Sequence, residues 1–151
     1  MMDDLRDLYE EVILDHNRNP RNFNRKAENG NCEAHGFNPL CGDEFTIHMA
    51  VEEGVINDVS FTGVGCAIST ASASLMTAAV KGKTVAEAEA LFASVHELLT
   101  DEKGEDVTDK VGKLKVLAGV KEYPMRVKCA TLAWHTMHAA MENKESTICT
   151  E

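Results

Sequence analysis

The stretch that decides the fold is residues 44–62, which reads Glu-Phe-Thr-Ile-His-Met-Ala-Val-Glu-Glu-Gly-Val-Ile-Asn-Asp-Val-Ser-Phe-Thr. Its first eight residues alternate in polarity, so one face of an extended strand would carry Phe45, Ile47, Met49 and Val51. Glu52-Glu53-Gly54 has the composition of a tight turn, and residues 55–62 resume an extended pattern. We therefore predict a β-hairpin with strands over residues 44–51 and 55–62.

Helical patterns lie on both sides of this hairpin. Apolar residues recur at helical spacing over residues 5–16, and Asn19-Pro20 ends that helix. After the hairpin, the sequence pattern predicts four helices, over residues 67–81, 84–99, 111–119 and 126–142. A capping box formed by Thr84 and Glu87 begins the second of them.

The segments outside these elements have weaker patterns. The composition of residues 17–40 predicts a long irregular connection that is mobile when nothing binds to it. Within this connection, residues 31–37 show a weak strand pattern. The tail from Asn143 is expected to fray.

The order of the elements predicts an α+β fold. One helix is followed by strands and then by a run of helices, which indicates a small antiparallel sheet of about three strands with helices packed on one face. The N-terminal helix and the C-terminal helical run complete this layer. A chain of 151 residues with 44% hydrophobic residues suits a single domain over residues 1–151.

Charge and composition narrow the class of protein. The formal net charge is −10, so we expect no nucleic-acid partner and no attraction to anionic membranes. The acidic N-terminus does not resemble a signal peptide, and no segment has the run of about 18 apolar residues that a membrane span needs. We expect a cytoplasmic protein, in which five cysteines are more often thiols or metal ligands than disulfides.

Cys41, Asp43 and Cys66 have neighbours that favour metal binding. Cys41 and Asp43 are two residues apart, so in an extended chain their side chains point the same way. Cys66 follows Gly63-Val64-Gly65 at the start of a predicted helix, where unpaired backbone amides favour a thiolate.

Cys129 is the third candidate cysteine. It follows Arg126 and Lys128, whose positive charges favour a thiolate. In the helix predicted over residues 126–142, Val127, Ala130 and Trp134 begin an apolar stripe. Cys129 lies about 200° around the axis from Val127 and therefore off that stripe. Together, three thiolates and one carboxylate suit tetrahedral Zn²⁺ or iron at the edge of a cluster, and the proposed ligands are Cys41, Asp43, Cys66 and Cys129. Arg126 and Lys128 could offset the negative charge that such a site retains.

Other ligating side chains have weaker support. Cys32 and Cys149 lie in polar or terminal segments, and we interpret both as accessible thiols without a role. His135 and His138 are three apart on a predicted helix, a spacing that can bind metal, but no nearby motif accompanies them. His35 lies in the loop before Cys41 and could approach the site.

Four segments resemble the IscU/SufU family, which also occurs as the N-terminal domain of NifU. They are Leu8-Tyr-Glu-Glu-Val-Ile-Leu-Asp-His-Asn-Arg-Asn-Pro-Arg-Asn22, Asn38-Pro-Leu-Cys-Gly-Asp43, Gly63-Val-Gly-Cys-Ala-Ile-Ser69 and Arg126-Val-Lys-Cys129. The resemblance covers about residues 5–141. It implies a role in iron–sulfur cluster assembly with a cysteine desulfurase as partner, and downstream assembly proteins or apo-proteins as recipients. It also implies metal or cluster ligands at Cys41, Asp43, Cys66 and Cys129.

Three features resemble the SufU branch more than the IscU scaffold branch. Lys128 precedes Cys129 where IscU scaffolds have a histidine, and residues 122–126 contain one proline in place of a chaperone-binding Leu-Pro-Pro-Val-Lys motif. The 62 residues between Cys66 and Cys129 also exceed the connection typical of IscU scaffolds. The SufU resemblance implies zinc at the four ligands, Cys41 as acceptor of persulfide sulfur from a SufS-like desulfurase, and Arg126 as a supporting residue.

The leading hypothesis is therefore a zinc-dependent persulfide sulfurtransferase that acts through Cys41 with Arg126. The alternative is a scaffold that assembles and transfers a transient [2Fe–2S] cluster, or holds iron, on the same four ligands. A third interpretation is a zinc-stabilised interaction module without sulfur chemistry. A metallohydrolase is disfavoured, because four protein ligands leave no open position for water.

Overall fold

The secondary structure follows the predicted order of elements. The structure is a computed structural model, and it describes residues 2–23, 32–39, 42–100, 124–141 and 147–149. The elements are α1 (Met2–Arg18), β1 (Cys32–Asn38), β2 (Asp43–Glu52), β3 (Val55–Val64), α2 (Ala67–Val80), α3 (Val85–Thr100), α5 (Pro124–Met141) and β4 (Thr147–Cys149). The helix predicted over residues 111–119 lies outside the described residues.

The strands form one sheet in the order β3-β2-β1-β4. β2 pairs antiparallel with both β1 and β3, so the predicted three-stranded antiparallel sheet is confirmed, including the strand that residues 31–37 signalled only weakly. The tail prediction was wrong for residues 147–149, because β4 pairs parallel with β1 and places Cys149 opposite Phe37. Three residues carry too little pattern to reveal a strand whose partner is more than 100 residues away in sequence.

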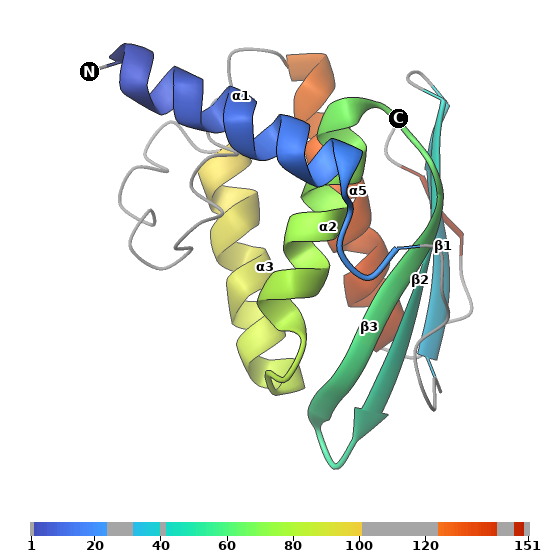
Figure 1. Cartoon of the computed structure of the whole chain (residues 1–151). Coiled ribbons are helices and arrows are strands. Elements are labelled where there is room, and N and C mark those ends of the chain that lie inside the picture. Colours follow the sequence, from blue (N-terminus) through green and yellow to red (C-terminus); the bar gives the residue numbers. More distant parts are fainter. Residues whose placement is uncertain (1, 24–31, 40–41, 101–123, 142–146, 150–151) are drawn as a thin grey trace.

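Helices cover one face of the sheet, as Figure 1 shows, and the predicted α+β class is confirmed. α5 packs on β1 and β2, α2 packs on β3 and α5, and α1 and α3 pack on α2 and α5 respectively. Small residues allow these close approaches. A Cβ at Gly36 would overlap the side chain of Thr136, so glycine lets α5 lie directly on β1. Ser72 on α2 donates to the carbonyl of Ala130 over 2.5 Å.

The core fills the space between the sheet and α2 and α5. Phe45, Ile47 and Met49 are fully buried, as their alternation predicted. The alternation fails at its last member, because a register shift between Ala50 and Val51 buries Ala50 and leaves Val51 half-buried. The local kink therefore replaces one predicted core residue with its neighbour.

Residues 16–23 tie the end of α1 to α2 and β3. The Nδ1 atom of His16 lies 2.7 Å from the hydroxyl of Ser74, and the backbone N–H of Arg21 donates to the same oxygen over 2.8 Å. Asn22 accepts a backbone hydrogen bond from Phe61 over 2.9 Å. The first part of the predicted irregular connection is thus held in place. In the part of the chain that is described, no helix has the length and apolar character that crossing a membrane requires.

Candidate metal centre

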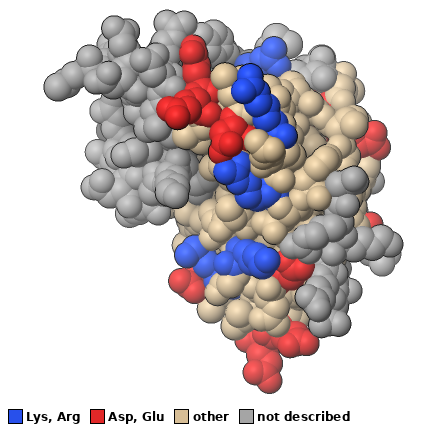
Figure 2. Space-filling view, viewed as in Figure 1, with Lys and Arg blue, Asp and Glu red and all other residues tan. Residues whose placement is uncertain are grey.

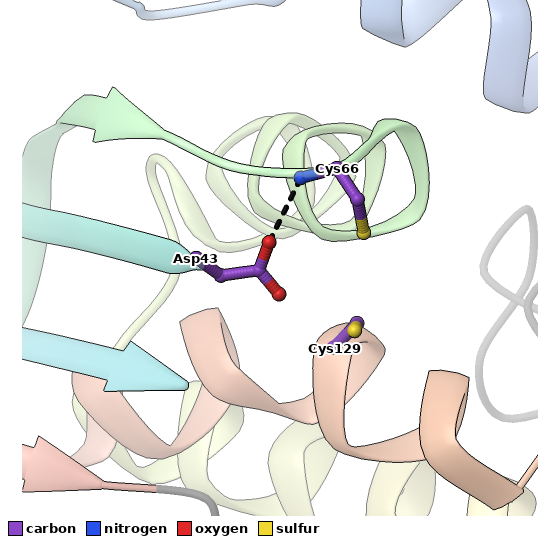
Figure 3. A group of neighbouring side chains, drawn as sticks. All are labelled: Asp43, Cys66 and Cys129. Carbon is purple, nitrogen blue, oxygen red and sulfur yellow. Dashed lines mark hydrogen bonds between the residues drawn. The ribbon is translucent and has the colours of Figure 1, made fainter. Parts of the chain in front are cut away.

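Three of the four predicted ligands meet at one end of the sheet. Asp43 begins β2, Cys66 precedes α2 and Cys129 lies in the first turns of α5. One carboxylate oxygen and the two sulfur atoms lie within 4.8 Å of one another, and Figure 3 shows the three side chains facing a common space. Within the described ranges, this is the group of three or more His, Cys, Asp or Glu side chains that could hold a metal ion.

Cys41 lies outside the described residues. Pro39 and Gly42, the nearest described residues on either side of it in the sequence, line a pocket of about 370 Å³ that Asp43 also lines.

The carboxylate of Asp43 has one satisfied oxygen and one orphaned oxygen. Asp43 is 1% exposed, and its Oδ1 atom accepts a hydrogen bond from the backbone N–H of Cys66 over 2.8 Å. Its Oδ2 atom is buried without a hydrogen-bond partner. Since an unpaired buried carboxylate oxygen is costly, a bound cation at this point would satisfy it. Two sulfur donors and this oxygen are a ligand set that fits zinc.

Cys66 is the N-cap of α2, as its position after three glycine-rich residues predicted. Its backbone is extended, with φ −68° and ψ 170°, and its Sγ atom accepts a hydrogen bond from the backbone N–H of Ser69 over 3.4 Å. The thiol thus takes the place of the usual serine or aspartate cap and lies where the helix dipole favours negative charge.

Gly65 provides the space that the carboxylate occupies. A Cβ atom at this position would lie 2.6 Å from the ring of Phe45 and 3.1 Å from Oδ1 of Asp43. Any larger residue would therefore push on a core ring and on a metal-ligand candidate at the same time.

Cys129 is fully buried and has a side-chain donor that the sequence analysis missed. The Nδ2 atom of Asn38 lies 3.8 Å from Sγ of Cys129, and Asn38 itself is fully buried at the end of β1. The signal was available in principle, because Asn38 occupies an inward-facing position after the buried residues Ala34 and Gly36. A polar residue at such a position indicates a specific partner.

The predicted basic residues lie on the same helix as Cys129. Arg126 and Lys128 are exposed in the first turns of α5.

On the face of the molecule in Figure 2, basic and acidic side chains of the described residues are interspersed. The net acidity is therefore not gathered into one patch on the described part of that face.

The remaining candidates lie apart from the ligand group. Cys32 begins β1, at the opposite end of the strand from Asn38, and burial raises the pKa of its thiol. His35 lines the pocket beside Asp43, but its Nε2 atom pairs with Glu44 over 2.9 Å and its Nδ1 atom lies 2.9 Å from the Thr46 hydroxyl.

His135 and His138 lie around Phe92, between α3 and α5, with ring centroids 5.2 Å and 5.1 Å from that of Phe92. They are not part of the ligand group. Of Cys149 the structure describes only its backbone pairing with Phe37.

The geometry can be compared with known families. Residues 8–130 match the NifU-like N-terminal domain. This chain belongs to the NifU-like N-terminal domain family. Within this family, it is 36% identical over 138 residues to the zinc-dependent sulfurtransferase SufU of Bacillus subtilis, a match covering 91% of this chain and 92% of that protein. It is 40% identical over 138 residues to the iron–sulfur cluster assembly scaffold protein IscU of Thermotoga maritima, covering 89% and 93% respectively.

A solved structure of a family member supports the same fold. It is described as an iron–sulfur cluster assembly scaffold protein for the SUF system from Fervidobacterium islandicum. The TM-score is 0.73 at 33% sequence identity, and the match covers 89% of this chain and 96% of that one. The predicted membership of the IscU/SufU family is confirmed.

Proposed function

We propose that this protein is a zinc-dependent sulfur carrier in iron–sulfur cluster assembly, which accepts persulfide sulfur from a cysteine desulfurase on Cys41. The observation that carries the proposal is the group of Asp43, Cys66 and Cys129, with the orphaned carboxylate oxygen directed into it. Cys41, two residues before Asp43, would complete a four-coordinate set. The zinc-dependent sulfurtransferase of Bacillus subtilis is a relative along nearly the whole chain, which supports zinc as the metal.

The chemistry of the transfer follows from thiolate exchange. A zinc ion held by Cys41, Asp43, Cys66 and Cys129 would keep the cysteines deprotonated and protect them from oxidation. In the reaction, the thiolate of Cys41 attacks the terminal sulfur of the cysteine persulfide on the desulfurase. A new S–S bond forms at Cys41, the S–S bond of the donor breaks, and the donor cysteine leaves as a thiolate. No external oxidant or reductant is needed.

The other residues have distinct roles in this proposal. Asp43, Cys66 and Cys129 would hold the metal while Cys41 reacts. Arg126, which is exposed on the helix that carries Cys129, offers a positive charge that stabilises the reacting thiolate. Lys128 in the place of the histidine of IscU scaffolds supports the assignment to sulfur transfer.

The test is sulfur transfer from a purified SufS-like desulfurase supplied with cysteine. Cys41→Ala should abolish the persulfide that mass spectrometry detects on this protein and the stimulation of desulfurase turnover. Cys32→Ser is the matched control, because Cys32 lies at the other end of β1, and it should leave both intact. Undiminished transfer in Cys41→Ala would contradict the proposal.

A second candidate is a scaffold that builds a [2Fe–2S] cluster on the same ligands and passes it to apo-proteins. The specific observation in its favour is the 40% identity to the scaffold protein IscU of Thermotoga maritima. Metal content after purification without added iron separates the two functions. About one zinc per chain supports the sulfur carrier, whereas iron with acid-labile sulfide, transferable to an apo-ferredoxin, supports the scaffold.

A further inference from the structure

Two of the cysteines at the site each accept a hydrogen bond from a donor that the fold holds in place. The sulfur of Cys66 accepts from the backbone N–H of Ser69, and the sulfur of Cys129 accepts from the side-chain amide of Asn38. Ser69 is in the first turn of α2 and Asn38 ends β1, so both donors belong to regular elements. These two sulfurs are therefore constrained by the fold as well as by any metal.

The donor to Cys129 is the side-chain amide of Asn38, whereas the donor to Cys66 is the backbone N–H of Ser69. A substitution at position 38 can therefore remove the donor to Cys129. Asn38 is fully buried, so its N–H groups cannot turn to bulk water. An N–H donor prefers a thiolate to a thiol as partner, since bonds to a charged acceptor are stronger. The contact thus suits Cys129 in the form that binds metal.

A hydrogen bond to a ligating thiolate also lowers its reactivity. The donor withdraws electron density from the sulfur, and partners of this kind orient the ligand and tune the strength of its bond to the metal. Asn38 is the register partner of Asp43 and stands at the base of the connection that carries Cys41. The Asn38 side chain therefore connects the end of β1, which precedes Cys41 in the sequence, with Cys129, which stays unreacted in the proposed transfer.

We propose that Asn38 is a positioning residue that keeps Cys129 bound to the metal and unreactive while Cys41 exchanges. The inference rests on the proposed function for the identity of the ligands and of the reacting cysteine. It adds that the Asn38 amide helps to make Cys129 a retained ligand.

The experiment is residue-resolved alkylation of the zinc-loaded protein, without desulfurase. Wild type, Asn38→Leu and Asn38→Asp are treated with limiting iodoacetamide, and mass spectrometry gives the labelling rate of each cysteine. Both substitutions keep the side-chain size but remove the donor. The ratio of Cys129 to Cys41 labelling should rise about tenfold in both variants, and zinc should pass to a chromophoric chelator faster by a similar factor.

The control is Asn57→Leu, which removes an exposed asparagine of β3 that hydrogen-bonds Glu52 over 3.3 Å. It should leave the labelling ratio and the zinc-release rate at wild-type values. Circular dichroism establishes that each variant is folded, and Asn38→Asp keeps the test decisive if the apolar leucine is not accepted at this site.

Two results would overturn the inference. One is an unchanged labelling ratio in a folded Asn38 variant. The other needs no variant and is faster labelling of Cys129 than of Cys41 in the wild type. The zinc content of the wild type is measured separately and reports on the proposed function alone, so failure of one hypothesis can be distinguished from failure of the other.

Discussion

The carboxylate of Asp43 is held by the backbone N–H of Cys66, over a distance of 2.8 Å. One candidate ligand therefore positions another, and does so through the residue that caps α2. Because this bond uses only Oδ1, the buried Oδ2 atom is directed toward the two sulfurs without a partner of its own. The end of β2 and the start of α2 are thus aligned for metal binding by a bond between protein groups.

Substitutions at Asp43 separate the charge of the carboxylate from its hydrogen bond. Asp43→Asn keeps an oxygen that can accept from Cys66 but removes the negative charge, whereas Asp43→Ala removes both. We expect zinc affinity to fall by at least about tenfold in Asp43→Asn and further in Asp43→Ala, measured by competition with a chelator. Equal affinity in wild type and Asp43→Asn would contradict a ligand role for this carboxylate.

Gly65→Ala tests the space beside the carboxylate. The added methyl group would press on the ring of Phe45 and on Oδ1 of Asp43. Overpacking of this kind should lower the free energy of unfolding by about 1–3 kcal/mol and weaken zinc binding as well. Val64→Ala is the control, because Val64 is 69% exposed and its truncation should change little in urea unfolding. Equal stability of the two variants would show that the site can relax around the methyl group.

Thr84→Ala tests the capping box that opens α3. The hydroxyl of Thr84 accepts from the backbone N–H of Glu87, and the Glu87 carboxylate accepts from the backbone N–H of Thr84, both over 3.1 Å. Losing the cap should reduce the free energy of unfolding by about 1 kcal/mol, as measured by chemical denaturation. Thr84→Ser keeps the hydroxyl and should restore most of that loss; a serine variant as unstable as the alanine variant would assign the effect to something else.

The histidines between α3 and α5 predict a pH dependence of stability. Burial lowers the pKa of His135 below its ordinary value of 6.5, and nearby His96 and His138 lower it further. As the pH falls through 6.5, the unfolded chain takes up a proton before the folded chain does, so the folded state loses stability.

The measurement compares wild type with His135→Gln in urea, at about pH 7.5 and about pH 5.5. The free energy of unfolding of the wild type should fall more between these values than that of the variant. An equal decrease in the free energy of unfolding for the two proteins would mean that His135 has the same pKa in the folded and unfolded states.

Much of the fold could be predicted because it depends on local patterns. The alternation that buries Phe45, Ile47 and Met49, the turn at Gly54 and the capping box at Thr84 each involve residues a few positions apart, and each is present in the structure. The cysteine motifs likewise predicted which side chains are candidates for a metal site, since Cys66 follows a glycine-rich break that opens a helix.

The tertiary structure alone determines the contacts between residues that are distant in sequence. The bond between Asp43 and Cys66 spans 23 residues, the contact of Asn38 with Cys129 spans 91, and β4 reaches β1 from the other end of the chain. Such contacts depend on how the sheet and helices pack, not on any repeating pattern. Sequence by itself therefore determined the elements and the type of ligands, whereas packing decided which oxygen of Asp43 is left open and which sulfur Asn38 holds.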